Sequence, residues 1–164
     1  MIKKFIILLF ITINSFSQSV YKDAAKINDS TDYYLEIGLF NKEEKKSYSK
    51  AILYTEKAID YAKAYKLNNK LADCYLQLAT IFFELEKNDL AIDYYIRAIS
   101  IYSKNEPKTN IALSYYSLGK CYLKKNNIAF AEIYFEKATG VYRKLNFIEA
   151  IELINLQKAI IEKE

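Results

Sequence analysis

The side chains best placed for chemistry in this sequence are two carboxylates, Asp89 and Asp93, which lie four residues apart. On a helix this spacing puts both on one face, as a general acid–base pair would require. The same positions also suit the first turns of a helix, where carboxylates interact favourably with the helix dipole. Arg97 follows Asp93 by four residues and would complete an ordinary ion pair. We therefore interpret the two carboxylates as helix-stabilising groups.

Other catalytic and metal-binding groups are missing from the sequence. It contains no histidine, the most common general acid–base and metal ligand. The serine-hydrolase, phosphate-loop, zinc-protease and Cys-x-x-Cys motifs do not occur, and three scattered glycines cannot form a phosphate-binding loop. We therefore expect a protein that has no catalytic activity and needs neither a cofactor nor a metal ion.

Two stretches of the chain repeat one pattern of residue sizes with an offset of 40 residues, as from Ala79 to Gly119. Within each stretch the first four positions and the last three have the spacing of two separate helix faces. Small residues would let the two helices approach closely, while aromatic residues fill the space between them. The matched positions are Tyr75, Leu78, Ala79, Phe82, Ala91, Tyr95 and Ala98, followed by Tyr115, Leu118, Gly119, Tyr122, Ala131, Phe135 and Ala138.

This pattern closely resembles the tetratricopeptide repeat, W-x2-L-G-x2-Y followed by A-x3-F, A and P. The departures are tyrosine at the first position, Ser103 and Arg143 in place of proline, and a period longer than the usual 34 residues. The resemblance implies an all-α superhelix, or solenoid, of antiparallel helix hairpins in a long-helix variety of the family. Such hairpins bury too little apolar surface to be stable alone and must stack on one another.

We expect the repeat domain to span residues 31–164, with repeats near 31–70, 71–110 and 111–146 and a capping helix at 147–163. The expected helices are 48–66, 71–85, 89–104, 109–125 and 128–144, with a turn from Asn41 to Ser47 and another near Asn68 and Asn69. The first repeat is degenerate, with Asn41 and Thr55 where aromatic residues should stand. Terminal repeats are expected to be atypical because one face meets solvent. Polarity of the capping helix would come from Gln157, Lys158, Glu162 and Lys163.

Residues 1–17 have the form of a cleavable signal peptide. Lys3 and Lys4 precede an apolar run, and Ser15 and Ser17 are the small residues expected before cleavage ahead of Gln18. No lipobox cysteine is present, so we expect a periplasmic or secreted protein, with residues 18–30 as a leader or short helix. Without the two leader lysines the formal net charge of +4 is halved, which leaves no electrostatic case for nucleic acid. The mature chain would hold no stretch long enough to span a membrane.

In an exported protein Cys74 and Cys121 invite a disulfide. Their positions within the repeat differ by about seven residues, or ~10 Å along parallel helices. This exceeds the ~7 Å that a disulfide tolerates between Cα atoms. We therefore expect two buried thiols.

The resemblance further implies that the first helices of successive repeats line a concave groove. In each of these helices one stripe at i, i+4 and i+7 lies outside the packing signature. The groove candidates are Leu76, Thr80, Phe83, Tyr116, Lys120, Leu123, Leu156 and Ile160, extended by Leu35, Leu39, Lys42 and Lys163. The floor would be mostly apolar, with Lys42, Lys120 and Lys163 along it. The alternative is that long helices bury the same residues against each other.

These observations favour an exported, non-enzymatic scaffold that binds a protein or peptide partner in the groove. A first alternative is the ectodomain, or a fragment, of a sensor histidine kinase or transcriptional regulator. A second is a structural spacer that self-associates through the ends of the solenoid. No feature of the sequence names the partner.

Overall fold

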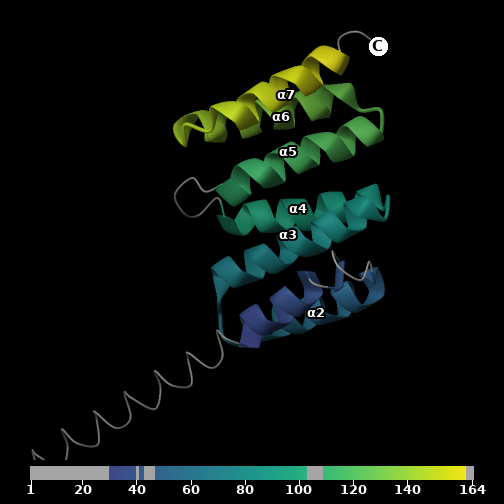
Figure 1. The fold of residues 1–164 in the computed structure, drawn as a ribbon, viewed down its shortest axis with the longest axis vertical. Helices are drawn as coiled ribbons and strands as arrows, with labels where there is room; N and C mark the ends of the chain where they lie inside the picture. The colour runs from purple at the N-terminus through teal and green to yellow at the C-terminus, as the bar shows by residue number, and fades with distance from the viewer. Residues whose placement is uncertain (1–29, 40, 43–46, 103–108, 162–164) are drawn as a thin grey trace, which may run out of the picture.

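The computed structural model describes residues 30–39, 41–42, 47–102 and 109–161, and the predicted all-α solenoid is confirmed over these residues. Residues 30–39 and 41–42 are helical and stand in the first-helix slot of repeat one. The following helices stack in chain order from one end of the molecule to the other (Figure 1). They are α2 (Tyr48–Ala64), α3 (Asn68–Glu84), α4 (Asn88–Tyr102), α5 (Thr109–Lys124), α6 (Ile128–Lys144) and α7 (Ile148–Ile161).

Small residues set the closest approach of paired helices. A β-carbon on Gly119 would lie 2.6 Å from the ring of Phe135 and 3.2 Å from the carbonyl oxygen of Ala131. Gly38 is equally confined, since a β-carbon there would lie 3.3 Å from the carbonyl oxygen of Ala51. The backbones of α5 and α6 therefore pass too close at this point for a larger side chain.

A tyrosine from each first helix packs against a tyrosine from its partner helix. Ring centroids are 6.3 Å apart for Tyr34 and Tyr54, and the equivalent pairs of repeats two and three are 5.9 Å and 6.3 Å apart. A cation covers the second ring of each pair at 5.0–5.4 Å, an arrangement that contributes ~0.5–1 kcal/mol at exposed sites. The cations are Lys57, Arg97 and Lys137, and the two further tyrosine pairs are Tyr75 with Tyr94 and Tyr115 with Tyr134.

Four of the turns between helices share one backbone conformation. Lys66, Glu86, Asn126 and Asn146 all have φ between 57° and 59°, the left-handed conformation that ends a helix. After Glu86, for example, the amide of Lys87 donates to the carbonyl of Phe82 at 2.9 Å, and the amide of Glu86 donates to that of Phe83 at 3.0 Å. These two bonds form a Schellman motif, and the same pair recurs at the other three turns. Helices α2 and α3, of 17 residues each, and the three-residue turn after each of them account for the offset of 40 residues from Tyr48 to Asn88.

Two predicted boundaries are wrong. The turn expected at Asn68 and Asn69 lies earlier, because the left-handed residue is Lys66 and α3 already begins at Asn68. In repeat one the helix continues through Asn41 and Lys42, where a turn was expected to begin. Asn41 is buried and its side-chain amide donates to the carbonyl oxygen of Ile37 at 2.8 Å, so its polar group is satisfied inside the helix.

Of the four residues predicted to make the last helix polar, Glu162 and Lys163 lie outside the described residues. Gln157 and Lys158 of α7 are half-buried, and the Lys158 ammonium pairs with Glu136 of α6. Exposed residues of α7 include both the polar side chains Glu149, Glu152 and Asn155 and the apolar side chains Leu153, Leu156 and Ile160, whose exposed fractions are 54%, 61% and 47%. The solvent-facing surface of α7 is therefore mixed, with large apolar side chains among polar ones.

Both cysteines are free and buried, as predicted. Cys74 lies in α3 and Cys121 in α5. Burial raises the pKa of each thiol from its usual 9.0 to about 12, and at Cys74 the carboxylates of Asp73 and Asp32 add to the effect. Each thiol is therefore protonated and unreactive at neutral pH.

The predicted signal peptide, residues 1–17, and most of the leader lie outside the described residues. Within the part that is described, no helix is both long and apolar enough to cross a membrane.

We predict that Ala131→Leu and Ala91→Leu destabilise the protein far more than Lys87→Leu. Both alanines are fully buried at helix crossings, where overpacking costs ~1–3 kcal/mol. Lys87 is exposed in a turn, where substitutions usually change the free energy of unfolding by less than ~0.5 kcal/mol. Thermal melts of the three variants provide the measurement. Equal melting temperatures would show that the helix register described above is incorrect.

We also predict that neither thiol of the folded protein reacts with Ellman's reagent at about pH 8, whereas both react in concentrated guanidinium chloride. Because each folded-state pKa lies above the unfolded value, the unfolded chain loses thiol protons first as pH rises. The thiols therefore lower stability progressively between pH 9.0 and about 12. The single variants Cys74→Ala and Cys121→Ala assign each signal. Rapid reaction of the native protein would contradict the burial of both groups.

Candidate partner-binding groove

The groove candidates from the middle repeats are neither fully buried nor fully exposed. Leu76, Thr80 and Phe83 of α3 are half-buried, as are Tyr116, Lys120 and Leu123 of α5, whereas Leu156 and Ile160 of α7 are exposed. Each half-buried residue presents part of its side chain to the core and leaves part accessible. The alternative of burial between long helices thus holds in part for α3 and α5, and it does not hold for Leu156 and Ile160 of α7.

The N-terminal half of the stripe contains a pocket of about 280 Å³ between α3 and the helical residues 30–39 and 41–42. Leucine side chains form its apolar wall, and its polar rim comes from both helices and from the start of α5. Its lining residues are Leu35, Leu39, Lys42, Asp73, Leu76, Gln77, Thr80 and Asn110.

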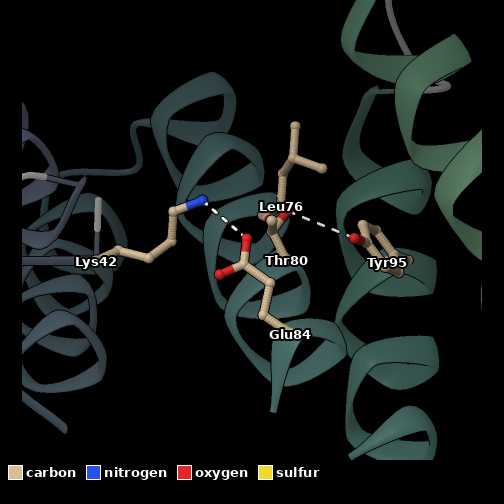
Figure 2. Close-up of polar contacts among 5 residues, drawn as sticks. All are labelled: Lys42, Leu76, Thr80, Glu84 and Tyr95. Carbon is tan, nitrogen blue, oxygen red and sulfur yellow. Dashed lines mark hydrogen bonds and ion pairs between the residues drawn. The ribbon is translucent and has the colours of Figure 1, made fainter. Parts of the chain in front are cut away.

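An ion pair ties the two sides of this pocket together. The Lys42 ammonium lies 3.1 Å from a carboxylate oxygen of Glu84, and the Lys42 side chain is only 13% exposed (Figure 2). Lys42 therefore lines the pocket with its charge already paired to Glu84, which the sequence did not indicate. The distance between the two residues along the chain is what concealed this pairing. Lys163 of the same predicted row lies outside the described residues.

Thr80 is occupied by contacts within its own repeat. Its hydroxyl donates to the carbonyl oxygen of Leu76 at 3.0 Å and lies 3.4 Å from the hydroxyl oxygen of Tyr95 (Figure 2). Burial raises the pKa of Tyr95, whose ring occupies the core between α3 and α4. Thr80 therefore positions the tyrosine hydroxyl and has little capacity left for a partner.

A second row of polar contacts, which the sequence analysis missed, joins neighbouring repeats. Asp32 pairs with Lys70, and one repeat later the Asp73 carboxylate accepts hydrogen bonds from Tyr102 and, at 2.9 Å, from Asn110. Burial and the neighbouring carboxylate raise the pKa of Tyr102. Both aspartates stand three residues before the leucine that opens the groove stripe, and this shared offset was the available signal.

The C-terminal half of the stripe is built around Lys120. Its ammonium lies 4.9 Å from the centroid of the Phe83 ring and 5.4 Å from that of Tyr116. Tyr116 in turn packs on Phe135 with 5.7 Å between ring centroids, and burial raises its pKa. Within the described part of the chain no carboxylate forms an ion pair with Lys120. Phe83, Tyr116 and Lys120 therefore contact one another.

The carboxylates considered first have structural contacts. Asp93 pairs with Arg97 at 2.9 Å, as predicted, while Asp89 pairs with Lys125 at the end of α5. No cluster of histidine, cysteine, aspartate or glutamate suited to a metal ion occurs in the described ranges. The arrangement of these side chains is suited to holding helices together and not to general acid–base chemistry.

Comparisons with solved structures agree on the fold. The N-terminal domain of stress-induced protein-1 (STI-1) from C. elegans is 17% identical with a TM-score of 0.63, over 79% of this chain and 97% of that one. Aspartyl phosphate phosphatase F from Bacillus subtilis is 23% identical with a TM-score of 0.68, over 82% of this chain but only 37% of that one. The Yersinia enterocolitica type III secretion translocator chaperone SycD is 18% identical with a TM-score of 0.57, over 79% and 95%.

No curated protein matches this sequence. A family model does match, and its description is tetratricopeptide repeat. The matched segment, residues 66–144, runs from the turn before α3 to the end of α6 and so covers both complete repeats recognised in the sequence. Residues 66–144 therefore match the tetratricopeptide repeat, the family that the sequence pattern resembles.

Proposed function

We propose that this protein is a non-enzymatic scaffold that binds another protein or a peptide in the groove lined by α3, α5 and α7. One observation carries the proposal: the stripe from Leu76 through Tyr116 to Leu156 keeps apolar surface accessible that the packing of the repeats does not use. Partly accessible aromatic side chains, here Phe83 and Tyr116, are typical anchors of protein interfaces. The tetratricopeptide family and the chaperone among its structural neighbours are consistent with this role.

Chemistry on a substrate is not part of this proposal. The titratable groups whose pKa values shift are buried tyrosines and cysteines raised by desolvation, together with one ion-paired arginine. None of them is a carboxylate or an amine tuned toward neutral pH, as a general acid or base would need to be. Binding, in contrast, requires only the shape and the apolar surface of the stripe.

If the groove binds the partner, substitutions in it should weaken binding without unfolding the protein. Leu76→Asp combined with Tyr116→Asp should abolish capture of the native partner, because charge on an apolar anchor opposes its desolvation. The milder pair Leu76→Ala and Tyr116→Ala should weaken capture at least tenfold while the helical circular dichroism signal is kept. Capture from an extract of the source cells, followed by mass spectrometry, is the measurement, and Leu53→Ala on exposed surface of α2 is the control. A folded alanine pair that captures the same protein undiminished would remove the groove from consideration.

We further propose that the protein is exported and that its mature form begins at Gln18. The proposal rests on the basic start, the apolar run and the small residues before position 18. The intact mass of protein recovered from the periplasm or medium should lack residues 1–17. Recovery of the chain only from the cytoplasm, or with residues 1–17 attached, would contradict it.

A further inference from the structure

A cavity of about 310 Å³ lies at the junction between repeats one and two, apart from the groove stripe. Helices α2 and α4 form its walls and α3 its floor, and it shares no residue with the groove candidates. Its volume is at the lower end of the range typical of small-molecule sites, ~300–1,000 Å³. Charged side chains dominate the walls, namely Glu56, Asp60 and Lys63 from α2 and Arg97 from α4, above the buried residues Tyr75 and Leu78.

The two carboxylates on the α2 wall have no compensating cation. Glu56 and Asp60 are both exposed and four residues apart, so they lie on one side of the helix with ~5–6 Å between their β-carbons. Like charges at this spacing destabilise a helix. Neither carboxylate forms an ion pair within the described part of the chain, and Lys63 forms none either. The α2 wall therefore carries negative charge that the fold does not use.

The opposite wall presents a guanidinium group in a fixed orientation. Arg97 pairs with Asp93 at 2.9 Å and lies over the Tyr94 ring, 5.4 Å from its centroid. The Arg97 side chain is 53% exposed, and a guanidinium has five N–H donors in a planar fork that matches a carboxylate. The Tyr94 ring also packs against Tyr75 and Phe82. A ligand ammonium is therefore better held by hydrogen bonds to the carboxylates than by an aromatic face.

The charges around this cavity define the ligand that would balance them. Three carboxylates, Glu56, Asp60 and Asp93, and two cations, Lys63 and Arg97, leave a net charge of −1. We propose that the cavity binds a free basic α-amino acid, lysine or arginine, in addition to the partner bound in the groove. The ligand carboxylate lies against Arg97, and its two cationic groups lie against Glu56 and Asp60. Such a ligand carries one negative and two positive charges and so neutralises the set.

The next junction along the solenoid shows that these carboxylates are not needed for packing. One repeat later the positions of Glu56 and Asp60 are occupied by Ile96 and Ser100 of α4. Helices α4 and α5 nevertheless pack on each other as α2 and α3 do. Neither isoleucine nor serine can balance the charge of an ammonium group. The amino-acid site is therefore specific to the first junction.

Isothermal titration calorimetry of the purified protein at low ionic strength tests this site. Lysine or arginine should bind at least tenfold more tightly than alanine and glutamate, because only a basic amino acid neutralises both carboxylates. Glu56→Gln and Asp60→Asn should each weaken that binding at least tenfold, since each replaces a charge with an amide of the same shape. Both side chains are exposed, so the melting temperatures should change little.

The repeats supply a matched control. Glu136 occupies the position of Glu56 in repeat three, so Glu136→Gln should leave amino-acid binding unchanged. Leu76→Ala combined with Tyr116→Ala should also leave it unchanged, which separates this site from the groove. The double variant Glu56→Ile and Asp60→Ser gives the first junction the side chains of the second. It should abolish binding while the helical circular dichroism signal is kept.

Three results would overturn the proposal. One is that no amino acid binds at millimolar concentration, and another is that Glu56→Gln and Asp60→Asn leave binding undiminished. The third is equal binding of Nα-acetyl-lysine amide, which lacks both the α-ammonium and the carboxylate. The cavity would then accept a lysine side chain of another protein and not a free amino acid. Partner capture that depends on Leu76 and Tyr116 would stand in all three cases.

Discussion

The fold depends on how closely two helix backbones can approach within each repeat. At Gly119 the space beside the helix is filled by the Phe135 ring and the carbonyl oxygen of Ala131, and Gly38 meets Ala51 in the same way. Small residues fix the distance between the two helices. This distance determines the space that the aromatic side chains on either side of the crossing fill. The tyrosine pairs and the cations that cover them recur in all three repeats because the crossing recurs. The same geometry turns a separate stripe of each first helix toward the groove.

Sequence periodicity was sufficient to predict this crossing, because its determinants are residue sizes within one hairpin. It predicted the stripe around Lys120 for the same reason. It failed wherever the answer depended on contacts between hairpins. The pairing of Lys42 with Glu84 and the position of Lys158 against Glu136 depend on the angle between stacked repeats. The sizes of the residues within one repeat do not indicate this angle. The helix boundary at Asn68 was missed because Lys66 is an unusual residue for the left-handed conformation, which favours glycine or asparagine.

The groove is therefore chemically uneven along its length, although the repeats that form it are similar. Ion pairs and amide contacts close its N-terminal half, whereas leucine and isoleucine side chains open its C-terminal half to solvent. Substitution at one position of the repeat, from Asp32 and Asp73 to Leu113 and Leu153, accounts for much of the change. A repeat protein can in this way keep one backbone while each unit offers a different surface.

The position of α7 at the end of the stack has an energetic consequence. Among the described helices its main packing partner is α6, whereas α3, α4 and α5 each have at least two such partners. In a solenoid whose stability is a sum over neighbouring units, fewer such contacts make local opening of a helix easier. A partner that contacts Leu153, Leu156 and Ile160 would add contacts to α7 and shift this opening equilibrium by mass action. Partner binding in the groove and the folding of α7 would then be linked, so that a change in one could be measured through the other.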